Sequence, residues 1–153
     1  MIYTFMDLIQ EKFSNLIDLF EKSNISNKLA LAILLVLGLI VRIFFALNVS
    51  LWHDEAVTAN AALSLIENGK PLFPSGYEYW RSFPFTLVVG LSAFIFGSSD
   101  LALRLPSILA GILVIGTTYM AGRKFYSEKV GFIGAVFVAF SGFSIAWSTQ
   151  VRM

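Results

Sequence analysis

The sequence predicts an all-α, polytopic membrane protein, and three observations carry this prediction. Of the residues, 57% are hydrophobic and only 14% are charged, and the mean hydropathy is +0.75. Between Lys28 and His53 the only formal charge is Arg42, and from Val130 to Val151 there is none. Uncharged apolar stretches of about 20 residues are long enough to cross a bilayer as helices. A soluble domain of this size would need more polar surface.

The composition also excludes several kinds of site. Cysteine is absent, so the chain forms neither disulfides nor thiolate metal sites. The net charge of +1 argues against nucleic acid as a partner, because such proteins present strongly basic surfaces.

The sequence predicts an N-terminal amphipathic interfacial helix and a linker over residues 1–28. Apolar residues recur there at i, i+3, i+4 and i+7 spacing from Ile2 to Phe20. The segment lacks the basic start and the small-residue cleavage site of a signal peptide. Such a helix lies on the membrane surface, packs on a partner helix, or only orients the first span.

Three spans are expected in the rest of the chain, over residues 29–49, 101–121 and 131–147. Residues 50–100 then form an outer loop with juxtamembrane helices. Within this loop, the apolar stretch 83–96 is too short to be a further span. Its 14 residues extend about 21 Å as a helix, whereas the hydrocarbon core is about 30 Å thick. We therefore expect a re-entrant or interfacial helix there.

The charge distribution predicts the orientation of these spans. The short loop 123–129 holds three basic residues and one acid, whereas the loop 50–82 holds four acids and two bases. Because basic loops favour the cytoplasm, the loop 123–129 and the N-terminus are expected inside. Asp54 and Arg152 then share the outer side.

Asp54 and Glu55 are the principal candidates for catalysis. Adjacent carboxylates at a membrane edge require an explanation, and a general base acting on a substrate from the bilayer is one. The alternative is local, since Asp54 would cap a helix over residues 56–67 and both acids favour the positive end of its dipole. His53 has no second His or Cys to complete a transition-metal site. A divalent cation, Mg²⁺ or Mn²⁺, bound by Asp54 and Glu55 is a further option.

Four arginines are candidates for binding a phosphate. Arg42 lies inside the first span, where a charge is a functional hypothesis by default, and Arg104 lies near the start of the second. Each has a structural ion pair or snorkelling toward the surface as its alternative. Arg81 and Arg152 lie outside the apolar stretches, and simple solvation is their alternative.

The order of these pieces resembles the membrane glycosyltransferases of the GT-C class. The likeness is greatest to the protein O-mannosyltransferase and aminoarabinose-transferase type, which use dolichyl- or polyprenyl-phosphate sugars. It covers about residues 29–153 and rests on a series of short motifs. They are "WHDEAVTANAALSLIENGK", "FPFTLVVGLSAFIFGSSDLALRLPSILAG", "YMAGRKFYSEKVGFIGAVFVAF" and "STQVRM".

The resemblance implies a function and an active site. Asp54 corresponds to the catalytic base, with Glu55 beside it, and the sugar is transferred with inversion to a hydroxyl or phosphate acceptor on the extracytoplasmic face. Arg104 and Arg152 best match family positions that bind the donor phosphate. The protein is then expected in the cell membrane, or in the endoplasmic reticulum membrane if the source is eukaryotic.

The chain also departs from the family pattern. A lysine that many relatives carry before the juxtamembrane helix corresponds to Ser82, so Arg81 would have to replace it. Relatives continue past the Arg-Met element into many more spans, which predicts an N-terminal fragment, a truncated reading frame or one part of a split enzyme. A partner membrane protein would then complete the fold.

Two other classes of function fit the same residues. A non-catalytic integral membrane subunit would use the two acids only as helix caps. A fragment of a transporter or channel would use Asp54, Glu55 and Arg42 as a relay, but the acids lie at the membrane edge rather than at mid-membrane.

Overall fold

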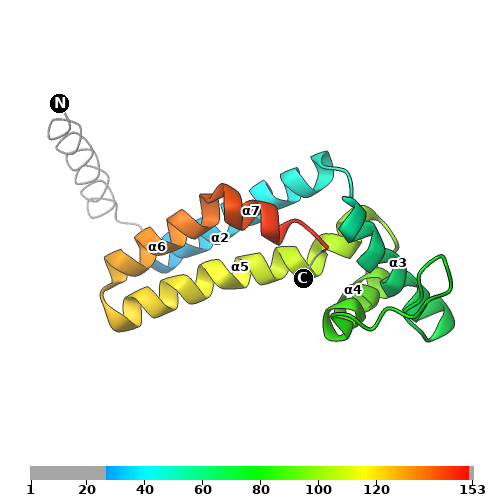
Figure 1. The fold of residues 1–153 in the computed structure, drawn as a ribbon. Helices are drawn as coiled ribbons and strands as arrows, with labels where there is room; N and C mark the ends of the chain where they lie inside the picture. Colours follow the sequence, from blue (N-terminus) through cyan, green and yellow to red (C-terminus); the bar gives the residue numbers. More distant parts are fainter. Residues whose placement is uncertain (1–26, 152–153) are drawn as a thin grey trace, which may run out of the picture. The chain divides into compact units, whose positions relative to one another are not determined.

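The computed structural model describes residues 27–151. The amphipathic helix predicted near the N-terminus and Arg152 lie outside this range. Within it the regular elements are six helices (Figure 1). One isolated bridge joins Leu72 and Glu78. The predicted all-α fold class is confirmed for these residues. The contacts given below lie within residues 34–151, which belong to one compact unit.

Two helices are long and apolar enough to cross a membrane, α2 (Asn27–Asn48) and α5 (Asp100–Phe125). At about 1.5 Å per residue they extend about 33 and 39 Å, enough for a hydrocarbon core of about 30 Å. Ser99 caps α5, since its hydroxyl accepts the Ala102 N–H. Asp100 in the first turn, with Arg123 and Lys124 in the last, complements the helix dipole.

The third apolar stretch is not one straight helix. It forms α6 (Glu128–Phe140) and α7 (Gly142–Ser148), which meet at a bend of 62°. Only the two helices together are long and apolar enough to make a third span. The break falls at Ser141-Gly142, and Gly/Ser pairs are a common cause of sharp kinks. Ser141 ends α6 and also caps α7, because its hydroxyl accepts the Ser144 N–H.

Small residues allow α5 and α6 to pack closely. A Cβ added at Gly122 would lie 2.5 Å from the Gly131 Cα, so only glycine fits at this crossing. Gly131, Ala135 and Ala139 follow one another at four-residue spacing along the buried face of α6. Such small-residue faces are typical of helix contacts inside membranes, where backbones approach one another closely.

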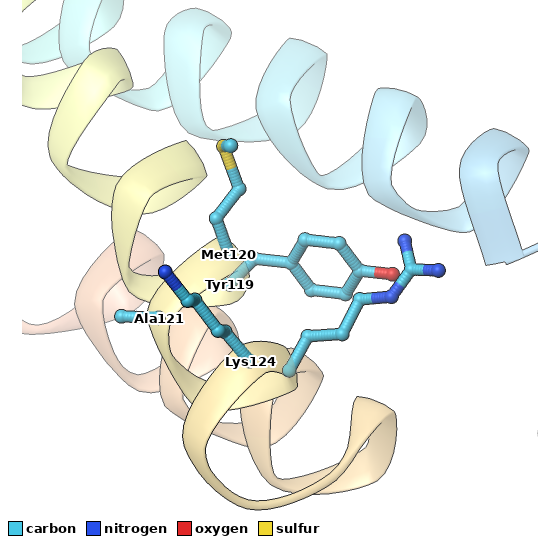
Figure 2. Close-up of a pocket in the computed structure, with 5 residues that line it drawn as sticks. Tyr119, Met120, Ala121 and Lys124 are labelled. Atoms are coloured by element: carbon cyan, nitrogen blue, oxygen red, sulfur yellow. The ribbon is translucent and has the colours of Figure 1, made fainter.

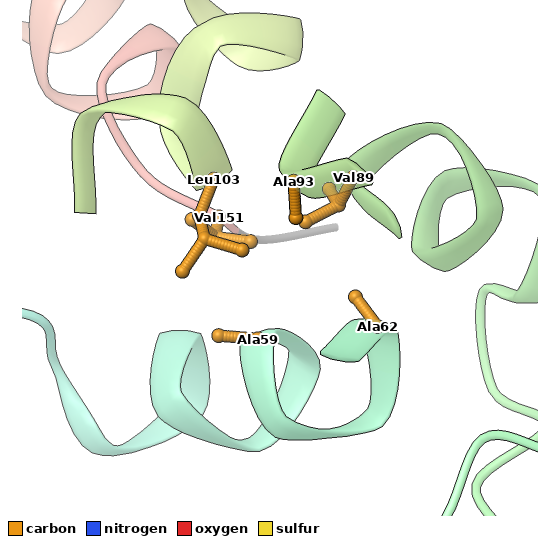
Figure 3. Packing of buried hydrophobic residues seen from close by; sticks show 6 residues of the cluster. All are labelled: Ala59, Ala62, Val89, Ala93, Leu103 and Val151. Carbon is orange, nitrogen blue, oxygen red and sulfur yellow. The ribbon is translucent and has the colours of Figure 1, made fainter. Parts of the chain in front are cut away.

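Helix α4 (Phe83–Phe96) packs against both α3 (His53–Asn68) and α5. The bounds of α4 coincide with those of the interfacial helix expected from the sequence. Gly90 of α4 lies close to α3, since a Cβ there would be 3.2 Å from the Ala62 carbonyl oxygen. The buried apolar cluster shared by these helices and the C-terminal segment is shown in Figure 3: Ala59, Ala62, Val89, Ala93, Leu103 and Val151.

Candidate functional site

A buried ion pair joins the start of α3 to the start of α5. The Arg104 guanidinium donates to both oxygens of Glu55, from Nε to Oε1 at 3.3 Å and from Nη2 to Oε2 at 3.1 Å. The two side chains are 1% and 0% exposed. This two-bond arrangement is the strong geometry of an arginine–carboxylate pair.

Two backbone N–H groups complete the environment of Glu55. Trp52, the residue before α3, donates to Oε2 at 3.0 Å, and Val151 donates to Oε1 at 2.7 Å. Glu55 therefore accepts four hydrogen bonds from three separate parts of the chain. Because a buried carboxylate needs such donors to offset its lost hydration, this position requires an acid with the reach of glutamate.

Arg104 also closes the end of α2. Its Nη1 donates to the carbonyl oxygens of Ala46 and Val49. The last four carbonyls of a helix have no partner within the helix, and Ala46 belongs to this group in α2. The pair of Glu55 and Arg104 thus connects the end of α2, the starts of α3 and α5, and the segment around Val151.

Asp54 lies beside this pair on the exposed side of α3. The helix starts at His53 with Trp52 as its N-cap residue, so Asp54 lies inside the first turn and does not cap a helix at residue 56. Successive helical residues are rotated by about 100°, and for this reason Glu55 points into the interior while Asp54 stays at the surface. An acidic residue in the first turn interacts favourably with the positive end of the helix dipole and so stabilises the start of α3.

The residues around Asp54 do not fit a divalent cation site. Among residues 27–151 no three His, Asp or Glu side chains gather as metal ligands. Both Glu55 oxygens already accept hydrogen bonds from Arg104 and from backbone N–H groups. A hard cation needs such oxygens as ligands, and those of Glu55 are already engaged.

Among residues 27–151, the other two arginines predicted to bind phosphate form no hydrogen bond with Glu55. Arg81 is exposed in the turn before α4. Arg42 is fully buried in α2, and its hydrogen bonds go to α6, α7 and its own helix. Of the four predicted phosphate-binding arginines, Arg104 is the one that contacts a predicted catalytic acid among the described residues.

The sequence did not predict the partners of these charges, which include the side chains of Ser144 and Ser148 and several backbone groups, the Val151 N–H among them. A signal for the serines does exist, since they are spaced four apart in an apolar stretch and so share one helix face. The Val151 N–H carries no such signal, because any residue offers the same donor.

Two cavities lie away from Glu55 and Arg104. One of about 410 Å³ is at the opposite end of α5 and is lined by Tyr119, Met120, Ala121, Arg123 and Lys124 (Figure 2). The Tyr119 hydroxyl donates to Glu128 Oε1 at 2.8 Å near this end. An apolar groove of about 230 Å³ lies between α3 and α4, lined by Leu65, Ile66, Leu87, Gly90, Leu91 and Phe94.

A family model described as dolichyl-phosphate-mannose-protein mannosyltransferase matches residues 82–153. The resemblance to GT-C membrane glycosyltransferases is confirmed. The match covers α4 to α7 and includes Arg104, whereas Arg42, Asp54 and Glu55 precede it. No curated protein and no solved structure matches the chain.

Proposed function

We propose that the chain is the N-terminal part of a membrane glycosyltransferase that uses a polyprenyl- or dolichyl-phosphate sugar as donor. The acceptor is a hydroxyl or phosphate group on the extracytoplasmic face. One observation carries the proposal: the buried bond between Glu55 and Arg104 attaches the helix that holds Asp54 to the segment that matches the mannosyltransferase family.

Asp54 is the general base of the proposed reaction. It removes the proton of the acceptor hydroxyl while the acceptor oxygen attacks the anomeric carbon of the sugar. The bond from that carbon to the lipid phosphate oxygen breaks, and the lipid phosphate leaves with the electron pair. A single displacement of this kind inverts the anomeric configuration. With a phosphate acceptor, the attacking oxygen is one of its own oxygens.

Glu55 acts here by orienting Asp54 rather than by touching substrate. Its carboxylate is fully buried and accepts four hydrogen bonds. These bonds fix the first turn of α3, and with it the backbone of the adjacent Asp54. A base held by a rigid helix start is pre-oriented for proton transfer, which lowers the entropic cost of reaching the transition state.

Arg81 and Arg152 are the proposed contacts of the donor phosphate. Arg81 is exposed, and Arg152 directly follows Val151 in the sequence. The planar array of N–H groups of an arginine guanidinium suits phosphate oxygens. Arg104 donates four of its five N–H groups to protein acceptors, so we give it a role in holding Glu55.

The sidedness of the proposed enzyme follows from the two ends of α5. Arg104 lies near its start, and the basic residues Arg123 and Lys124 lie in its last turn. Because basic loops favour the cytoplasm, we place residues 123–129 inside and Asp54 outside. With two helices long enough to span a membrane and a bent pair that would make a third, we place the chain as a multi-pass protein in the cell membrane or the endoplasmic reticulum membrane.

Neither cavity described above is lined by Asp54, Glu55 or Arg104. We therefore place the donor lipid in the bilayer beside these residues. A partner membrane protein that covers the lipid from the other side belongs to this proposal.

Replacing Asp54 tests the proposal directly. In an active membrane preparation that contains the chain, Asp54→Asn keeps the size of the side chain but removes the base. We expect transfer from a polyprenyl-phosphate sugar to fall by a factor of about 10² to 10⁴, the usual contribution of a general base. The matched control is Glu67→Gln, which neutralises an exposed acid in the last turn of the same helix. Transfer at the wild-type rate by Asp54→Asn would exclude Asp54 as the base.

A further inference from the structure

Arg42 is a fully buried cation in a helix long enough to span a membrane. Its guanidinium makes five hydrogen bonds, as many as it has N–H groups. Among residues 27–151 its five acceptors are carbonyl and hydroxyl oxygens, and none of them is a carboxylate. The charge is therefore stabilised by neutral oxygen atoms alone.

These oxygens come from both sides of the bend between α6 and α7. On the α6 side, the carbonyl oxygens of Ala139 and Val138 accept from Nη1 at 3.1 Å and from Nη2 at 3.4 Å. On the α7 side, the hydroxyls of Ser148 and Ser144 accept from Nε at 2.8 Å and from Nη2 at 2.9 Å. The fifth bond returns to the Gly38 carbonyl of α2 at 3.2 Å.

The two α6 carbonyls need an external donor because of the bend. α6 ends at Phe140, so Val138 and Ala139 belong to the last four residues, whose carbonyls have no partner within the helix. Unsatisfied carbonyls are costly in a medium without water. They also form the negative end of the α6 dipole, which favours a positive charge.

Glycine provides the space for this arrangement. A Cβ added at Gly111 of α5 would lie 2.5 Å from the Ser148 Cβ and 2.9 Å from the Arg42 Nε. A larger residue would push α7 and the guanidinium apart. By contrast, a Cβ at Gly116 of the same helix would meet nothing within 4 Å.

The segment that leaves α7 runs directly to the proposed active site. Ser148 is the last residue of α7, and three residues later the Val151 N–H donates to Glu55 at 2.7 Å. Val151 is also fully buried in the apolar cluster with α3, α4 and α5. The position of α7 therefore determines whether this N–H reaches the carboxylate.

We propose that Arg42 is a positioning residue that fixes the bend between α6 and α7 and thereby holds residues 149–151 against Glu55. This role replaces the phosphate contact expected for Arg42 from the sequence. The effect of Arg42 on sugar transfer rests on the proposed function. Its effect on the bend between α6 and α7 is independent of that function.

The requirement for arginine follows from the number and spread of its donors. Lysine keeps the charge but offers three N–H groups from one atom, and methionine offers none. Lysine can therefore donate hydrogen bonds to only some of the acceptors on the two sides of the bend. Methionine leaves the α6 carbonyls without a donor.

Distances between two spin labels test the bend. The chain has no cysteine, so Val130→Cys in α6 and Trp147→Cys in α7, both at exposed positions, give a unique pair. The labelled 153-residue chain is reconstituted in phosphatidylcholine nanodiscs. The distance between the two labels is measured by pulsed electron–electron double resonance. The variants added to it are Arg42→Met, Arg42→Lys and Gly111→Ala. The controls are Lys28→Met, an exposed cation in the same helix, and Gly116→Ala.

We expect one narrow distance for the parent and for both controls. Arg42→Met and Gly111→Ala should broaden the distribution and shift it to longer distances, and Arg42→Lys should lie between them and the parent. If Arg42→Met does not yield a monodisperse protein, the distance distributions of Gly111→Ala and Gly116→Ala are compared instead. Gly111→Ala retains the buried charge of Arg42. Distributions for Gly111→Ala and Arg42→Lys that equal that of the parent would overturn the proposal.

Steady-state kinetics in an active preparation separates positioning from phosphate binding. A positioning role predicts that Arg42→Lys lowers kcat and leaves the KM for the lipid-phosphate donor unchanged, whereas a lost phosphate contact would raise KM. A raised KM with unchanged label distances would assign Arg42 to the donor instead. If the wild-type preparation shows no sugar transfer, the proposed function fails, and the label distances still decide whether Arg42 fixes the bend.

Discussion

Arg104 and Arg42 are both fully buried, but their charges are stabilised in different ways. Arg104 is neutralised by one carboxylate, Glu55, in a two-bond ion pair. Arg42 has no acid among the described residues and is solvated by three carbonyls and two hydroxyls. The two arginines therefore show two ways to stabilise a buried cation. Where a helix breaks, the carbonyl groups at its end have no partner within the helix, and their partial negative charge takes the place of a carboxylate.

A third charged group lies in an exposed environment. Lys70 and Glu78 form an ion pair at 2.9 Å, with side chains 61% and 42% exposed. Water screens such a pair, so it contributes far less than the buried one. The predictions below concern Arg104, Arg42 and Glu78 in turn, and the expected effect of the substitution decreases in that order.

Removing Arg104 should have the largest effect on stability. Arg104→Met leaves the Glu55 carboxylate buried without its cation, which costs about 3–5 kcal/mol. Thermal unfolding in detergent, followed by circular dichroism, measures the loss. The double variant Glu55→Leu/Arg104→Met should be more stable than Arg104→Met alone, because no unpaired charge remains. Arg81→Met, at an exposed position, serves as the control, and equal stability of Arg104→Met and this control would refute the prediction.

Ser148→Ala should have an intermediate effect. It removes the acceptor of the Arg42 Nε bond at 2.8 Å, and a hydrogen bond to a charged group contributes about 1.5–3 kcal/mol. The same unfolding measurement applies. A double-mutant cycle with Arg42→Lys should show non-additive losses, since the two residues share this bond. Additive losses would mean that the serine stabilises α7 independently of Arg42.

The smallest effect concerns the pH dependence of the exposed pair. The Trp80 indole N–H donates to Glu78 at 2.7 Å, and together with Lys70 it lowers the pKa of this carboxyl. A group whose pKa is lowered by folding stabilises the folded loop above its unfolded pKa, and loses this contribution as the pH falls through the folded pKa. The Trp80 indole ¹⁵N–¹H resonance should therefore shift with a midpoint below 4.5, the ordinary value for Glu78. In Glu78→Gln the resonance should not titrate there, and a midpoint at or above 4.5 would contradict the assignment.

Part of the fold was predictable because hydrophobicity is a local property. The helical class, the apolar helices α2 and α5, and the short helix over residues 83–96 all correspond to runs of apolar residues that can be read directly. The bend at Ser141-Gly142 was not predicted, although a Gly/Ser pair is a known cause of kinks. The apolar pattern continues unchanged across it, so hydropathy alone describes a straight span.

The sequence by itself determined that Asp54 and Glu55 stand at the edge of a membrane helix and that Arg42 lies inside one. Only the tertiary structure decided which acid is buried and what each arginine contacts. Glu55 and Arg104 are 49 residues apart, and Arg42 is 96 to 106 residues from its acceptors in α6 and α7. Helix periodicity places adjacent acids on different faces, but which face turns inward depends on the charge that another helix brings to it. A buried charge is stable only where such partners converge, and their convergence is a property of packing rather than of any local pattern.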